Sequence, residues 1–132
     1  MKKIFLIFLF FLPIGCTDVE LVNPDISSIT LSTDKNLYHS DELMNITASI
    51  QSNIESENLI LRIYGIYSGR NRLDSSKTIN LKKGMNMESI QYKTPRCTGC
   101  AGIRPGTYQI NAQLKYNNTL IANASKDIDI AQ

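Results

Sequence analysis

Two cysteines separated by two residues, Cys97 and Cys100, are the side chains in this sequence best placed to do chemistry. Such a pair can close a small disulfide in an oxidising compartment, exchange electrons as a thiol–disulfide couple, or supply half of a structural zinc site. Only His39 and Cys16 remain to complete four zinc ligands. Residues 101–105 contain glycine and proline and do not predict the helix that lowers a redox thiol pKa. We expect a loop-rigidifying disulfide, with redox and zinc chemistry as alternatives.

No other set of side chains predicts catalysis. His39 stands in a segment that we interpret as a turn, and the chain offers no Ser/His/Asp or Cys/His arrangement around it. Two carboxylate pairs, Asp41 with Glu42 and Asp127 with Asp129, fall at expected strand edges, where charge prevents edge-to-edge pairing. Calcium binding by these pairs is the alternative. We predict a protein that is not an enzyme and has no cofactor and no metal.

The first sixteen residues predict export. Two lysines are followed by an apolar run over residues 4–12 and by glycine before Cys16. The run is too short for a membrane span, which needs about 20 apolar residues. Gly15-Cys16 resembles the cleavage box of prokaryotic lipoproteins. That resemblance implies removal of residues 1–15 and lipidation of Cys16, which would hold the protein outside the cytoplasm on the cell membrane. An ordinary secreted protein is the alternative.

Charge is balanced in the mature chain but unevenly placed. Removing Lys2 and Lys3 leaves 12 basic and 12 acidic residues, so no nucleic-acid signature remains and we expect no nucleic-acid partner. Acidic residues dominate positions 16–59, and basic residues dominate positions 60–105. We expect the two parts to lie side by side and partly neutralise each other. The alternative is a basic patch for an anionic glycan or a lipid headgroup.

The rest of the chain predicts one β domain over residues 26–132, joined to Cys16 by a polar tether over residues 16–25. Apolar and polar residues alternate with period two, and turn residues separate the runs. Such alternation predicts antiparallel sheets with one buried face and one wet face. Seven strands are expected, at residues 26–33, 43–51, 59–67, 77–81, 87–92, 107–116 and 119–130.

Two motifs add a resemblance to this pattern. Pro105-Gly106-Thr107-Tyr108 opens a long alternating strand and resembles the tyrosine corner of immunoglobulin-like sandwiches. Asp34-Lys35, Tyr38 and Glu42, placed before the second expected strand, resemble secreted archaeal-type immunoglobulin-like modules. The resemblance implies an all-β, seven-stranded antiparallel immunoglobulin-like sandwich with a scaffold or interaction role. It supplies no catalytic residues.

One expected strand carries a second apolar stripe. Leu59, Leu61, Ile63 and Tyr67 suit the core, which leaves an unusually apolar opposite face. Aromatic residues and arginine are enriched at protein interfaces, so we interpret that face and the loop after it as a partner-binding surface, unless a neighbouring loop covers it. The residues of the proposed surface are Ile60, Arg62, Tyr64, Ile66, Arg70 and Arg72.

Three sequons, at Asn45, Asn117 and Asn123, are candidate glycosylation sites, and all fall on expected polar faces or turns. Taken together, the sequence predicts a membrane-tethered immunoglobulin-like module with a binding or structural role at the cell surface. Its expected partners are the membrane, through the lipid anchor, and a protein or an anionic glycan. A carbohydrate-binding sandwich and a small envelope thiol–disulfide protein that uses Cys97 and Cys100 are the alternatives.

Overall fold

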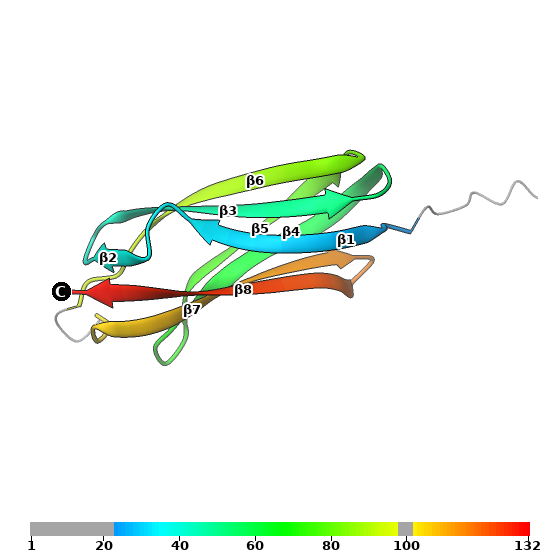
Figure 1. The fold of residues 1–132 in the computed structure, drawn as a ribbon. Helices are drawn as coiled ribbons and strands as arrows, with labels where there is room; N and C mark the ends of the chain where they lie inside the picture. Colours follow the sequence, from blue (N-terminus) through cyan, green and yellow to red (C-terminus); the bar gives the residue numbers. More distant parts are fainter. Residues whose placement is uncertain (1–22, 98–101) are drawn as a thin grey trace, which may run out of the picture.

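The computed structural model describes residues 23–97 and 102–132, and all regular structure in them is β (Figure 1). The expected signal peptide over residues 1–15, Cys16, most of the expected tether and Cys100 lie outside the described residues. No helix in the described ranges is long and apolar enough to cross a membrane. The strands are β1 (Ile26–Thr33), β2 (Leu37–His39), β3 (Leu43–Ser52), β4 (Ser56–Tyr67), β5 (Asn71–Leu81), β6 (Gly84–Lys93), β7 (Gly106–Tyr116) and β8 (Thr119–Ala131).

The strands form two sheets that pack face to face. A three-stranded sheet has the order β1-β3-β6, and a five-stranded sheet has the order β2-β8-β7-β4-β5. Every pairing is antiparallel except that of β2 with β8, which is parallel. The predicted all-β immunoglobulin-like sandwich is confirmed.

The sequence pattern missed β2, which makes the strand count eight instead of seven. Three residues are too few to display alternation, and their pairing with Asp129–Ala131 of β8 is visible only in the fold. The sequence led us to expect His39 in a turn, but it lies at the end of a strand. The middle residue, Tyr38, is fully buried.

The core follows the alternation that the sequence displays. In β3 the side chains of Met44, Ile46, Ala48 and Ile50 are all 0 % exposed. In β7, which belongs to the opposing sheet, Ile110, Ala112 and Leu114 are equally buried. Each large apolar side chain removed from water in this way contributes about 1.5–3 kcal/mol to folding.

A break in the alternation of β4 corrects the expected stripe. Gly65 and Ile66 both have positive φ, 149° and 52°, and the strand changes face there. Ile66 is therefore fully buried and is not part of the outward surface, whereas Tyr67, expected in the core, is 67 % exposed. Gly65 is required because a Cβ at that position would lie 2.2 Å from the carbonyl oxygen of Gln109. Strict period two fails wherever such an irregularity is inserted.

The tyrosine corner predicted from the sequence is present. The hydroxyl of Tyr108, near the start of β7, donates a hydrogen bond to the backbone carbonyl of Arg104, four residues upstream. This bond fastens the β6–β7 connection, which joins the two sheets, to the start of β7.

The two ends of the sandwich carry different segments (Figure 1). The chain enters at Asn23 at the end that holds the β3–β4, β5–β6 and β7–β8 turns. The β6–β7 connection, which contains Cys97, lies at the opposite end together with Gln132. We call these the entry end and the far end.

Candidate binding surfaces

The middle of the five-stranded sheet carries a cluster of polar and aromatic side chains on its outward face. Arg62 of β4 donates two hydrogen bonds to Asp74 of β5, from Nε to Oδ1 at 2.9 Å and from Nη2 to Oδ2 at 2.8 Å. The guanidinium carbon also lies 4.3 Å from the centre of the Tyr64 ring, two residues along the same strand. A bidentate ion pair and a cation–π contact thus fix one guanidinium group.

The cluster extends to the next strand. The hydroxyl of Tyr64 accepts a hydrogen bond of 3.0 Å from Nε2 of Gln113 in β7. The register makes this contact diagonal, since Tyr64 lies opposite Asn111 and Gln113 lies two residues further along β7, opposite Arg62. Arg62, Tyr64, Asp74 and Gln113 therefore form one connected group across β5, β4 and β7, which we call the Arg62 cluster.

The ion pair shifts the pKa of both Arg62 and Asp74. The hydrogen bond to Asp74 raises the pKa of Arg62, and the hydrogen bond from Arg62 lowers the pKa of Asp74. The two side chains are 34 % and 48 % exposed, so water screens this pair and an approaching molecule can reach it. The cluster presents a positioned cation and an aromatic ring to solvent.

The expected partner-binding residues do not all lie on one surface. Ile60, Arg62 and Tyr64 share the outward face, and Ile60 is 42 % exposed. Ile66 lies in the core instead, for the reason given above. Arg70 is exposed in the β4–β5 connection, while Arg72 donates to the carbonyl oxygen of Ser68 from two nitrogens at 3.4 Å. A role for these residues in binding stays a prediction.

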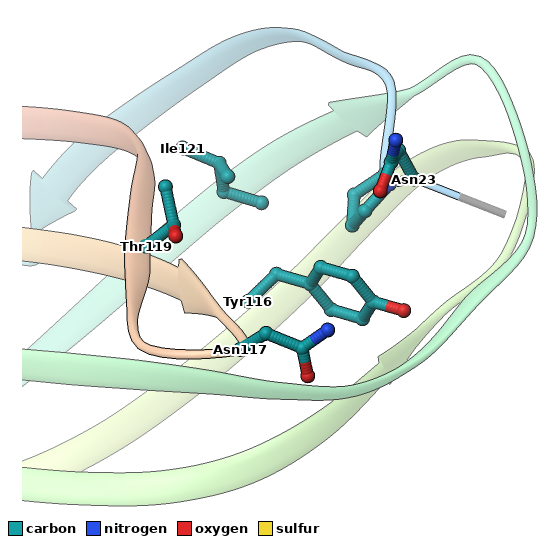
Figure 2. Close-up of a pocket in the computed structure, with 6 residues that line it drawn as sticks. Asn23, Tyr116, Asn117, Thr119 and Ile121 are labelled. Atoms are coloured by element: carbon teal, nitrogen blue, oxygen red, sulfur yellow. The ribbon is translucent and has the colours of Figure 1, made fainter. Parts of the chain in front are cut away.

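A small pocket of about 350 Å³ opens at the entry end, and the sequence did not reveal it (Figure 2). Its walls come from the start of the described chain and from the β7–β8 hairpin, which are distant in sequence. Figure 2 shows the Tyr116 side chain beside Asn117, facing the Asn23 segment. The lining combines aromatic, aliphatic, amide and hydroxyl groups, from Asn23, Pro24, Tyr116, Asn117, Thr119 and Ile121.

The far end holds Cys97 and His39. The backbone N–H of Cys97 donates to Oγ of Ser40 at 2.9 Å, and its half-buried Sγ lies 3.5 Å from the carbonyl oxygen of Ala131. Cys97 is a free cysteine in the structure, so the expected disulfide is not shown; it stays a prediction because Cys100 lies outside the described residues. Nδ1 of His39 lies 3.6 Å from Oε2 of Glu42.

In residues 23–97 and 102–132, no group of three or more His, Cys, Asp or Glu side chains could hold a metal ion. The three sequon asparagines, Asn45, Asn117 and Asn123, are all exposed, as a glycan would require. Whether they carry glycans stays a prediction.

The ion pairs show how the uneven charges are arranged. Arg96 pairs with Asp41 at 2.7 Å and joins the basic part of the sequence to the acidic part. The other Lys/Arg pairs lie within one part: Lys35 with Glu42, Arg62 with Asp74, and Lys77 with Glu88. The described ion pairs therefore neutralise charge mostly within each part of the chain and less between the two parts.

The fold defines the class of protein: an all-β immunoglobulin-like sandwich. No protein-family model and no curated protein matches the chain, but solved structures do. The CARDB domain of PF1109 from Pyrococcus furiosus, in a solution NMR structure, is 16 % identical with a TM-score of 0.58, over 81 % of this chain and 94 % of that chain. A crystal structure of the same domain, in complex with di-metal ions, is 15 % identical with a TM-score of 0.56, over 81 % and 93 %.

A third similar structure is the alkylpurine DNA glycosylase AlkC of Pseudomonas fluorescens, bound to DNA containing an abasic site analog. It is 12 % identical with a TM-score of 0.55, over 83 % of this chain but 30 % of that chain. At these identities the comparisons establish the fold.

Proposed function

We propose that this protein is a lipid-anchored module outside the cytoplasm, which binds a protein partner through the outward face of its five-stranded sheet. The observation that carries the proposal is the Arg62 cluster, in which Asp74 and Gln113 hold a cation and an aromatic ring in place on a solvent-facing surface. The lipid anchor rests on the sequence pattern that ends in Gly15-Cys16.

The chemistry of the face favours a protein as the partner. Arginine and tyrosine are the residue types over-represented among binding hot spots, and both have lost much of their side-chain freedom before binding. Ile60, 42 % exposed on the same face, supplies apolar area next to them. An anionic glycan is the other partner class with which the arginine is compatible.

The fold agrees with such an arrangement. Because the described chain enters at Asn23, an anchor at Cys16 would attach the entry end to the membrane. The far end would then point away from the bilayer, and the sheet faces would be reached from the side.

The anchor is tested with the full chain expressed in a prokaryotic host that processes lipoproteins. We expect the wild-type protein in the membrane fraction, with an intact mass equal to residues 16–132 plus a lipid modification. Cys16→Ser should appear unlipidated in the soluble extracytoplasmic fraction. Equal membrane association of both proteins, with no added mass, would contradict the anchor.

The binding face is tested by chemical cross-linking of whole cells followed by recovery of this chain. Arg62→Ala and Tyr64→Ala should lose cross-linked protein partners that the wild type retains. Ser76→Ala, directly opposite Arg62 on β5, is the matched control and should retain them. If Arg62→Ala and Tyr64→Ala keep their folds and retain every partner, the proposed binding face is contradicted.

A further inference from the structure

Strand β6 forms an open edge of the three-stranded sheet. It pairs with β3 through ten consecutive residue pairs, from Leu43 with Lys93 to Ser52 with Gly84, and the register contains no bulge. On its other side it has no strand partner among the described residues. A regular edge of this length offers backbone N–H and C=O groups that can pair with another strand.

The other sheet edges are protected in ways that β6 is not. The β1 edge is irregular between Ile26 and Ser28 and lies alongside β8. The β2 edge is three residues long. The β5 edge carries three charged side chains along its length, Arg72, Asp74 and Lys77, whereas β6 carries none from Gly84 to Met87. Short length, irregularity and charge are the devices by which natural sheets avoid edge-to-edge pairing.

The outward side chains of β6 are apolar at its entry-end half. Met85 and Met87 are 61 % and 69 % exposed. The one acidic residue of the strand, Glu88, is paired across the open side of the sandwich with Lys77 of β5 at 2.6 Å. The entry-end half of the edge therefore presents two methionines, and the carboxylate next to them, that of Glu88, is held in an ion pair.

We infer that β6 is a self-association site, where it pairs antiparallel with β6 of a second copy of this chain and Met87 lies opposite Met87 of that copy. The pairing joins two three-stranded sheets into one six-stranded sheet with two-fold symmetry. It is independent of the lipid anchor and of the Arg62 cluster, which lies on the other sheet.

The side chains of β6 and its length favour one register for pairing with a second copy. An antiparallel pair centred on Glu88 sets two carboxylates directly opposite each other, and one centred on Ser89 sets the methionines opposite Gln91 and Lys93. Centring on Asn86 sets Met85 opposite Met87 but pairs only residues 84–88 of each β6. Centring on Met87 pairs residues 84–90, sets Met87 opposite Met87 and Met85 opposite Ser89, and opposes no like charges. In a register whose two-fold axis falls between two residues, an outward-facing residue of one copy would lie opposite an inward-facing residue of the other. The two sheets would then not continue with matching faces.

The interface is short, so we expect a weak dimer, below the size of a stable protein–protein interface. A covalent trap is therefore the right test. Cross-strand residues directly opposite each other bring their Cβ atoms to about 4.5–5.5 Å, close to the separation that a disulfide spans.

The experiment uses the full chain in the cells that express it, with Cys97 and Cys100 changed to Ser and Cys16 retained. Met87→Cys is added to this background and oxidised mildly. Thr30→Cys is the matched control, because Thr30, Ser49 and Met87 form one row across the sheet and Thr30 lies at the opposite edge. The background without an added cysteine measures any dimer formed through Cys16.

We expect a reducible dimer with Met87→Cys, and only the background level of dimer with Thr30→Cys. A double Met85→Cys, Ser89→Cys variant should also dimerise. In a chain without added cysteines, chemical cross-linking should capture a dimer that Met87→Lys abolishes, since a charge at this exposed position disfavours pairing without disturbing the core. Equal dimer from Met87→Cys and Thr30→Cys, or a cross-linked dimer unaffected by Met87→Lys, would overturn the inference.

Discussion

The hydroxyl of Tyr38 donates a hydrogen bond to the carboxylate of Asp34, four residues earlier in the chain. Tyr38 is 0 % exposed, and its oxygen also accepts the backbone N–H of Lys35 at 2.8 Å. Oδ1 of Asp34 in turn accepts the backbone N–H of Asn45 at 3.0 Å. Asp34 and Tyr38, which belong to the motif noted before β3, therefore have a structural role. Their hydrogen bonds fasten the β1–β2 connection to β3.

This arrangement predicts a pH dependence of stability. The hydrogen bonds from Tyr38 and Asn45 lower the pKa of Asp34 below its ordinary value of 3.8. A carboxylate with a depressed folded-state pKa stabilises the fold above its unfolded pKa, and that contribution is lost as the pH falls through the lower, folded value. Asp34→Asn should therefore lower stability at neutral pH and weaken the loss on acidification below pH 3.8.

Denaturant midpoints measured from neutral pH to acid for the wild type, Asp34→Asn and the exposed-site control Asp127→Asn check this prediction. The control should follow the wild type. An identical acid dependence in all three proteins would contradict the role of Asp34.

Loss of the bidentate pair in the Arg62 cluster should affect binding more than stability. Asp74→Asn removes the charge that holds Arg62, but the two side chains are 48 % and 34 % exposed. We expect a change in the free energy of unfolding below about 1 kcal/mol. Partner capture in the whole-cell cross-linking experiment should still fall, because the guanidinium group is no longer held. A large loss of stability would show that the pair is structural.

The tyrosine corner should contribute measurably to stability. Tyr108→Phe keeps the ring and removes the hydrogen bond to the carbonyl of Arg104. We expect a loss of about 1 kcal/mol. Tyr67→Phe, at a side chain 67 % exposed, is the matched control and should be neutral. Urea denaturation of the three proteins makes the comparison, and equal midpoints would rule out a stabilising corner.

Gly65 should tolerate no side chain. Alanine there would bring Cβ to 2.2 Å from the carbonyl oxygen of Gln109 and 2.9 Å from Cα of Ile110, both in the backbone of β7. We expect destabilisation of about 3 kcal/mol or more. Gly69→Ala shares a positive φ of 70° but meets no atom within 4 Å, so about 1 kcal/mol is expected. Thermal unfolding separates the two, and similar losses would refute the steric account.

Regular alternation made most of this fold predictable. β1 begins and ends where the sequence predicted, and β3, β7 and β8 differ by one residue at an end. These strands bury one face and expose the other to water, so apolar and polar residues alternate along them. The tyrosine corner was equally readable, because Tyr108 and the preceding turn residues are adjacent in sequence.

What the sequence did not reveal depends on backbone irregularity or on distant contacts. The change of face at Gly65 and Ile66 broke period two and moved Ile66 from the expected surface into the core. Of the Arg62 cluster, the sequence pointed to Arg62 and Tyr64 but not to their partners Asp74 and Gln113, because these come from other strands. The sequence did not predict the entry-end pocket, because its walls also come from segments that are distant in sequence.

The placement of Asn23 and Gln132 at opposite ends of the sandwich has a mechanical consequence (Figure 1). A pull between these two residues runs along the strands. β1 is drawn lengthwise past β3, and β8 past β2 and β7, so the hydrogen bonds between them are strained together and do not open one after another. A domain loaded in this way resists tension between its two ends.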